Sequence, residues 1–114
     1  MELMDGGDLY NYVIEQARRS NRGFDTNFVR FYAAQIYLAL EFLHANSIVY
    51  RDLKPENVVI DSNGHSKITD FGISKENINF TDKRANTNCG TSEYMSPEVL
   101  ILILKSTYEF KLIN

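Results

Sequence analysis

The chain has 114 residues, enough for one small domain with a hydrophobic core, and its net charge of −3 excludes the basic footprint of a nucleic-acid-binding domain. The single cysteine, Cys89, excludes an internal disulfide and fits a reducing compartment. The longest apolar run, 99–104, is far shorter than the roughly 20 residues of a membrane helix and no secretory signal is visible, so we expect a cytoplasmic or nuclear protein.

The first predicted elements are a turn and a short helix. Residues 1–4 are typical of a strand end, and the glycine pair at 6–7 predicts a turn. Asp8 is a residue type that caps helices, and the apolar spacing after it predicts a helix over 9–19. The apolar face of this helix consists of Leu9, Tyr12 and Val13.

The second predicted helix is long and apolar. The polar stretch 18–23 breaks the helical spacing and predicts a loop before it. Asp25 or Thr26 can cap the helix, which continues to about Ala45. Its apolar residues cover so much of the circumference that we expect a core element. They are Phe28, Tyr32, Ile36, Ala39 and Leu43, with Phe31, Leu38 and Phe42 widening the stripe.

Short strands are predicted after this helix. Residues 48–50 form one strand, and residues 58–60 and 66–69 form two more. Asn-Gly within the intervening 61–65 is a strong hairpin signal, so we expect the last two strands to pair. The polar stretch 74–95 lacks periodicity and predicts a loop.

Two motifs flank this hairpin. Residues 50–57 read Tyr-Arg-Asp-Leu-Lys-Pro-Glu-Asn, which places a carboxylate (Asp52) five residues before an amide (Asn57), with Lys54 between them. An Asp-Phe-Gly sequence begins at Asp70. Because the hairpin would place Asn57 and Asp70 at the bases of its two strands, their side chains can converge on one metal ion.

These are the parts that a phosphoryl transfer site needs: a carboxylate to orient the attacking hydroxyl and oxygen ligands for Mg²⁺. Together with Ser-Pro-Glu at 96–98, they resemble the catalytic core of eukaryotic protein kinases. The resemblance covers residues 2–100 and is strongest to the basophilic Ser/Thr kinases related to cAMP-dependent protein kinase. Further segments that carry it are Glu2–Leu9, Phe31–Ile36 and Cys89–Tyr94.

The resemblance implies an α+β fold of a particular kind. It is a fragment of the large lobe (C-lobe) of a protein kinase, mainly helical, with short β-hairpins around the catalytic loop. Residues 1–100 would form a partial kinase domain with hinge, large-lobe helices, catalytic loop and activation segment, and 101–114 a divergent tail. The implied cofactors are ATP and Mg²⁺.

The resemblance assigns catalytic roles to four residues. Asp52 would accept or orient the proton of the substrate hydroxyl, and Lys54 would neutralise the phosphoryl group in transfer. Asn57 and Asp70 would bind Mg²⁺ and, through it, the nucleotide. Outside this motif, Asp52 would be read as an ordinary turn acid, and Asn57 can also cap a strand.

A second implied role is regulation by phosphorylation. Thr87 would be the phosphothreonine of the activation loop, modified by an upstream kinase. Arg51 and Lys75 would bind its phosphate and so order the loop. The alternative is that Thr87 is an exposed loop threonine like its neighbours Thr81 and Thr91.

Substrate and nucleotide contacts are also implied. Glu56 and Asp8 would attract arginines near the phosphoacceptor of a protein substrate through carboxylate–guanidinium pairs. Asp8 can equally bind the ribose hydroxyls or cap its helix. Thr91 would bond to Asp52 and Lys54 and help form the substrate shelf. The adenine contacts would come from Glu2 and Met4 in the hinge and from Val59 beneath the base.

Some parts of a kinase are missing from these 114 residues. No Gly-rich loop is present, nor the strand Lys and helix Glu that accompany it. After residue 100, the Asp-Trp-Trp-like helix of the family does not follow, and Ser92 and Ser96 replace a Pro and an Ala. We therefore expect a fragment of an ATP-dependent Ser/Thr protein kinase that is inactive alone.

Two alternatives remain. The chain can be a non-catalytic, truncated kinase product that binds a partner through its long helix or its tail. It can also be a small-molecule phosphotransferase, which shares the Asp-(x)₄-Asn loop and a later metal-binding Asp. The Lys-Pro-Glu at 54–56, the Phe-Gly at 71–72 and the segment 89–98 argue against this last class.

Overall fold

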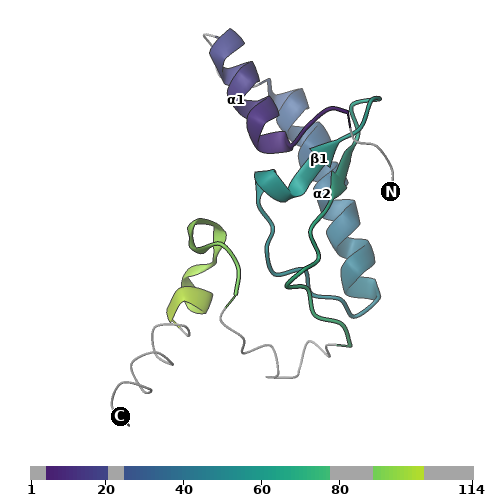
Figure 1. Ribbon diagram of the computed structural model, residues 1–114, viewed down its shortest axis with the longest axis vertical. Coiled ribbons are helices and arrows are strands. Elements are labelled where there is room, and N and C mark those ends of the chain that lie inside the picture. The colour runs from purple at the N-terminus through teal and green to yellow at the C-terminus, as the bar shows by residue number, and fades with distance from the viewer. Residues whose placement is uncertain (1–4, 21–24, 78–88, 102–114) are drawn as a thin grey trace.

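The two longest helices and a small sheet are the main regular elements (Figure 1). The computed structural model describes residues 5–20, 25–77 and 89–101, of which residues 97–101 are also helical. Within these ranges, no helix has the length and apolar character needed to cross a membrane. In chain order, the elements are α1 (Leu9–Arg19), α2 (Thr26–Ala45), η1 (Pro55–Asn57), β1 (Val58–Ile60), β2 (Ser66–Ile68) and η2 (Ser92–Tyr94), where η marks a short 3₁₀ turn.

Both predicted helices form, and each begins at an aspartate cap. The Asp8 carboxylate accepts a hydrogen bond from the backbone N–H of Asn11 at 2.8 Å. Asp25 accepts one from the backbone N–H of Asn27 at 3.2 Å. These bonds satisfy N–H groups that have no partner within the helix, so both starts follow from local sequence.

The predicted hairpin also forms. Strands β1 and β2 pair antiparallel, with Val58 opposite Ile68 and Ile60 opposite Ser66. In the turn, the Asp61 carboxylate accepts hydrogen bonds from the backbone N–H groups of residues 63 and 65, at 2.8 and 2.9 Å. Gly64 has φ +83°, a conformation that favours glycine, so Asp61 and Gly64 together close the turn.

The core lies where α1 and the hairpin pack on α2 (Figure 1). Tyr32 of α2 is at its centre, and the rings of Tyr12 and Phe28 lie within 6.1 Å of it, centroid to centroid. A polar contact adds to the packing, because the side-chain oxygen of Gln35 accepts hydrogen bonds from both the backbone N–H and the hydroxyl of Ser66. The buried members of this core are Leu9, Tyr32, Val58 and Ile60.

Three details differ from the sequence-based predictions. Residues 48–50 do not form a strand; instead Val49 makes a single antiparallel bridge with Lys75. One hairpin, rather than several, lies beside the catalytic loop in the described residues. The stretch 74–95 contains the turn η2 as well as loop.

The predicted apolar stripe of α2 is buried only in part. Leu43 is buried like Tyr32, but the residues expected to widen the stripe face solvent. Phe31, Leu38 and Phe42 are 46, 59 and 68% exposed. We call these three residues the α2 outer stripe. The prediction that α2 is a core element holds for Tyr32 and Leu43, but in the described residues the α2 outer stripe is not covered, because α1 and the hairpin pack on the other side of α2.

Candidate active site

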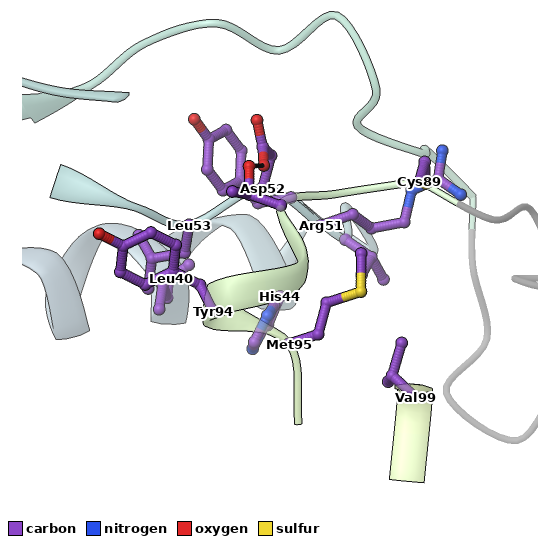
Figure 2. A pocket seen from close by; sticks show the side chains of 12 residues that line it. Leu40, His44, Arg51, Asp52, Leu53, Cys89, Tyr94, Met95 and Val99 are labelled. Atoms are coloured by element: carbon purple, nitrogen blue, oxygen red, sulfur yellow. Dashed lines mark hydrogen bonds between the residues drawn. The ribbon is translucent and has the colours of Figure 1, made fainter. Parts of the chain in front are cut away.

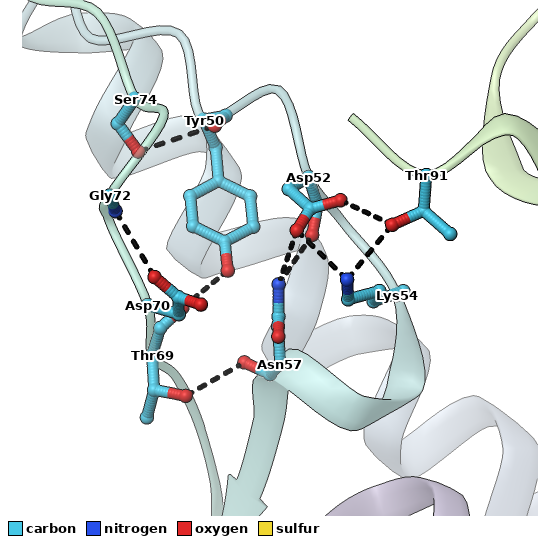
Figure 3. A network of polar contacts seen from close by, with 9 residues as sticks. All are labelled: Tyr50, Asp52, Lys54, Asn57, Thr69, Asp70, Gly72, Ser74 and Thr91. Atoms are coloured by element: carbon cyan, nitrogen blue, oxygen red, sulfur yellow. Dashed lines mark hydrogen bonds and ion pairs between the residues drawn. The ribbon is translucent and has the colours of Figure 1, made fainter. Parts of the chain in front are cut away.

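The centre of the site is the carboxylate of Asp52, which accepts hydrogen bonds from three side chains (Figure 3). The Thr91 hydroxyl donates to Oδ1 at 2.7 Å, and the Asn57 amide donates to Oδ2 at 2.9 Å. The Lys54 ammonium lies 3.0 Å from Oδ2 and also donates to the Thr91 hydroxyl at 2.8 Å. The structure therefore contains both contacts of Thr91 that the resemblance implies.

This arrangement fixes the charges at the site. The Thr91 hydrogen bond is the largest cause that lowers the pKa of Asp52, with Lys54 and Asn57 acting in the same direction. Asp52 in turn raises the pKa of Lys54. Because its pKa is lowered, Asp52 is a carboxylate anion at neutral pH. Its side chain is 12% exposed, so the carboxylate remains open to a small polar group.

Local structure explains the position of Asn57. A proline at the start of η1 pre-sets the turn, and Asn57 ends that turn directly before β1. The side chain of Asn57 is buried, and its amide nitrogen donates to both the carboxylate and the backbone oxygen of Asp52. With the nitrogen engaged in this way, the amide oxygen is the atom of Asn57 that can bind a cation.

Asp70 lies at the base of the other strand, as predicted. The backbone oxygen of Asn57 accepts hydrogen bonds from the N–H and the hydroxyl of Thr69, at 2.9 and 3.3 Å. Asp70 itself has φ +55°, and one oxygen of its exposed carboxylate accepts a bond from the backbone N–H of Gly72 at 3.2 Å.

An amide oxygen and a carboxylate are hard ligands suited to Mg²⁺, which proteins hold through one or two carboxylates together with substrate phosphates. The described residues contain no group of three or more His, Cys, Asp or Glu side chains that would hold a metal by itself. The donor set of Asn57 and Asp70 fits a magnesium ion that takes its remaining ligands from other groups.

Arg51 directly precedes Asp52 in the chain and has φ +70°. Its Nε donates to the backbone oxygen of Ile73 at 2.7 Å, while its buried Nη1 has no hydrogen-bond partner among the described residues. Lys75 is nearby through its backbone bridge to Val49. Thr87, their expected phosphorylated partner, lies outside the described residues.

Of the predicted substrate and nucleotide residues discussed next, Asp8, Glu56 and Val59 lie within the described residues. Both oxygens of Asp8 accept bonds from Asn11, the backbone N–H at 2.8 Å and the side-chain amide at 2.7 Å, so the capping role of Asp8 is present. Glu56 is exposed on η1, and half-buried Val59 makes an antiparallel bridge with Asp8. Glu2 and Met4 lie outside the described residues.

The segment before Asp8 is docked closely on β1. The N–H of Gly6 donates to the oxygen of Ile60 at 3.0 Å, and the N–H of Ile60 donates to the oxygen of Gly7 at 2.8 Å. A Cβ atom at Gly6 would lie 2.6 Å from the Ile60 oxygen, which only glycine avoids. This approach places Asp8 beside Val59.

A cavity of about 400 Å³ adjoins the site, and its lining includes Asp52 and Thr91 (Figure 2). Its walls come from the end of α2, from residues 49–53 and from the segment 89–99. Half-buried Cys89 lines this cavity. Sequence patterns gave no signal for the cavity, because its three walls are far apart in the chain.

The chain matches the protein kinase domain family over residues 1–112. The chain belongs to the protein kinase family. It is 48% identical over 100 residues to the serine/threonine-protein kinase SCH9 of Candida albicans, covering 88% of this chain and 12% of the relative. It is also 48% identical over 100 residues to the protein kinase C delta type of Homo sapiens, and that alignment covers 88% of this chain and 14% of the relative. The protein kinase C-like 1 of Caenorhabditis elegans is 47% identical over 100 residues, with 88% and 14% covered.

These comparisons confirm the resemblance to a eukaryotic Ser/Thr protein kinase catalytic domain and the kinase-fragment fold. The chain spans about one-eighth of the length of these relatives, 12 to 14%. The family match continues to residue 112, and the division into a partial kinase domain at 1–100 and a divergent tail at 101–114 stays a prediction.

Proposed function

We propose that this chain carries the catalytic loop of a Ser/Thr protein kinase that transfers the γ-phosphoryl group of MgATP to protein serines or threonines near arginines. The observation that supports this most is the Asp52 carboxylate held by Thr91, Asn57 and Lys54. A turn acid without a catalytic role does not require three side-chain donors, one of which comes from Thr91, 39 residues further along the chain.

The reaction joins the substrate hydroxyl oxygen to the γ-phosphorus and breaks the bond from that phosphorus to the β–γ bridging oxygen, with ADP as the leaving group. Bound MgATP would supply the phosphoryl group, and its Mg²⁺ would neutralise charge on the phosphate oxygens. Asp52 accepts the hydrogen bond of the attacking hydroxyl and directs its lone pair; as the new O–P bond forms, the hydroxyl proton passes to Asp52 and from there to water. Because the pKa of Asp52 is lowered, we infer that orientation, rather than strong basicity, is its main contribution.

The remaining residues hold the reactants. Lys54 lies beside Asp52 and places a positive charge where the phosphoryl oxygens pass. Asn57 and Asp70 would hold Mg²⁺ through their side-chain oxygens. Glu56, exposed on η1, would attract an arginine of the substrate.

The same proposal includes activation by phosphorylation at Thr87. Its support is the buried Nη1 of Arg51, which lacks a partner in the described residues. A buried, unpaired guanidinium nitrogen is costly, and a phosphate oxygen would satisfy it by a charge-assisted bond. We expect an upstream kinase to supply this phosphate.

The 114-residue polypeptide alone is expected to be inactive, because it contains no Gly-rich loop to cover the phosphates. Metal-dependent peptide phosphorylation by the purified chain, abolished in Asp52→Asn, would overturn that expectation.

Catalytic competence is tested in a chimera. Residues 2–100 replace the matching segment of the human protein kinase C delta type, to which this chain is 48% identical. We expect the chimera to phosphorylate a basic peptide and the Asp52→Asn chimera to lose at least about 100-fold of the rate. Glu41→Gln, on the exposed side of α2, is a matched acid-to-amide control. A folded chimera with no activity, or one in which both variants behave alike, contradicts the proposal.

A second candidate is a binding module without catalysis. The α2 outer stripe favours it, because Leu38 and Phe42 are each more than half exposed. This candidate predicts that Asp52→Asn and Asp70→Asn leave the cellular phenotype of the chain unchanged, whereas Phe42→Ser alters it.

A further inference from the structure

The outer side of α2 carries a continuous apolar line. The α2 outer stripe (Phe31, Leu38 and Phe42) is between 46 and 68% exposed, and the neighbouring Tyr37 is 65% exposed. Ala34, which is also exposed, lies between Phe31 and Leu38. Positions three or four apart lie on the same side of a helix, so 31, 34, 38 and 42 follow one another along one face. An exposed apolar line of this length marks an interaction site.

Two opposite charges lie beside this line, near its two ends. Arg30 and Glu41 are both exposed, and about three helical turns separate them, so they share one edge of the face. Among the described residues, neither has an ion-pair partner. A two-fold axis perpendicular to the helix would bring Arg30 of one copy opposite Glu41 of a second copy, and the reverse. A parallel pair would place like charges opposite each other, so the charges select the antiparallel direction.

The same register interleaves the apolar side chains. With the two charges level, Ala34 of each copy lies beside the two-fold axis, about 2 Å from it along the helix. Phe31 of one copy then falls between Leu38 and Phe42 of the other. A small residue at the centre allows the two helices to approach, and the large side chains on either side of it interdigitate. Charge and shape therefore select the same register.

We infer that the outer side of α2 is a self-association surface, on which a second copy of this chain docks antiparallel. The α2 outer stripe supplies the apolar contact, and the pairs of Arg30 with Glu41 at the rim set direction and register. The occupant is a second copy because the face contains both halves of the match: both charges, and both the small and the large side chains. None of the proposed catalytic residues belongs to this surface, so the proposed function does not depend on it.

The first test is sedimentation equilibrium of the 114-residue chain. A contact confined to one helix per copy lies at the low end of interface sizes, so we expect a dimer with a dissociation constant on the order of 10–100 µM. In Arg30→Glu, both rim pairs become like-charge pairs, and we expect this constant to rise at least about tenfold. Arg30→Glu combined with Glu41→Arg restores opposite charges, and the constant should return to within about threefold of wild type.

Arg18→Glu is the matched control for the change of charge. It makes the same substitution at an exposed position in the last turn of α1, away from α2. We expect it to leave the dissociation constant within about twofold of wild type.

The second test locates the two-fold axis by disulfide formation between copies. Cys89 is the only cysteine of the chain, so Cys89→Ser gives a background without thiols. In the proposed register, residues at position 34 of the two copies are about 5 Å apart along the helix direction, and those at position 45 about 30 Å. We therefore expect Ala34→Cys to form a disulfide-linked dimer under mild oxidation, and Ala45→Cys, which is also at an exposed position, to stay monomeric over the same time.

Circular dichroism and urea midpoints show whether each variant is folded. A wild-type chain that stays monomeric at about 500 µM overturns the inference and leaves the face to a different partner. A dimer that the double charge exchange does not rescue, or equal cross-linking at positions 34 and 45, also overturns it, because either result places the second copy elsewhere or in another register. If Arg30→Glu is not folded, the cross-linking comparison decides alone.

Discussion

Replacing Thr91 by valine tests the centre of the site with little change of side-chain shape. The substitution removes the 2.7 Å hydrogen bond to Asp52 Oδ1 and leaves the carboxylate with the Asn57 and Lys54 contacts. A hydrogen bond to a charged group contributes about 1.5–3 kcal/mol, and about 1.4 kcal/mol corresponds to a tenfold rate change. If the bond is fully used in the transition state, kcat/KM should fall by about 10- to 100-fold.

The assay is peptide phosphorylation by the chimera, with Thr91→Ser as the control that keeps the hydroxyl. A second measurement follows the Asp52 carboxyl carbon by NMR during an acid titration of the 114-residue chain. Because Thr91 is the largest cause that lowers the pKa of Asp52, this pKa should rise in Thr91→Val and stay low in Thr91→Ser. A Thr91→Val rate within twofold of wild type, with the pKa of Asp52 unchanged, would refute the reasoning.

Three further predictions concern stability, each measured by urea unfolding. Val58→Ala should lower the free energy of unfolding by about 1–3 kcal/mol, because Val58 is 1% exposed. Val59→Ala should lower it clearly less, because Val59 is half-buried. Equal losses in the two variants would contradict the core assignment. Ser47→Gly should stabilise the chain by about 0.5–1 kcal/mol, since Ser47 has φ +58° after α2, while Ser20→Gly, at the extended end of α1, should not; a loss of stability at Ser47 would argue against the backbone assigned there. The pKa of Asp8 is lowered mainly by its backbone bond to Asn11, so its stabilising effect is present above the ordinary value of 3.8 and lost as the pH falls below it. Asp8→Asn, which keeps a capping side chain, should make stability less dependent on pH between about 5 and 3, and an unchanged pH profile would count against the cap.

The helices and the hairpin could be predicted from sequence because their signals are local. Asp8 and Asp25 each cap the helix that follows within three residues. Asp61 and Gly64 close the hairpin turn through bonds within five residues. Such signals do not depend on the rest of the fold.

The errors arose where burial or strand pairing depends on parts of the molecule that are distant in the sequence. Helical spacing predicted that Phe31, Leu38 and Phe42 widen the apolar stripe of the helix, but only the packing shows that α1 and the hairpin leave them exposed. Residues 48–50 have strand-forming character, yet a strand needs a partner along its length, and Lys75 supplies a single bridge.

The site was predictable to the extent that it resembles a known family. The contact of Thr91 with Asp52 joins residues 39 positions apart and follows from no periodicity. The left-handed backbone of Arg51 and Asp70 gives no sequence signal, because neither residue is a glycine. The hydrogen bond from the Tyr50 hydroxyl to Thr69 could not be predicted either, because its acceptor is a backbone oxygen, which every residue has.

Two of the positive-φ positions, Arg51 and Asp70, have a consequence for laboratory evolution of this chain. Each holds a non-glycine residue at a positive φ, which costs on the order of 1–2 kcal/mol compared with glycine. A library selected only for heat resistance should therefore enrich Arg51→Gly and Asp70→Gly, the substitutions that remove the proposed phosphate and metal ligands. Natural retention of both side chains in this chain is what selection for chemistry, rather than for durability, would produce.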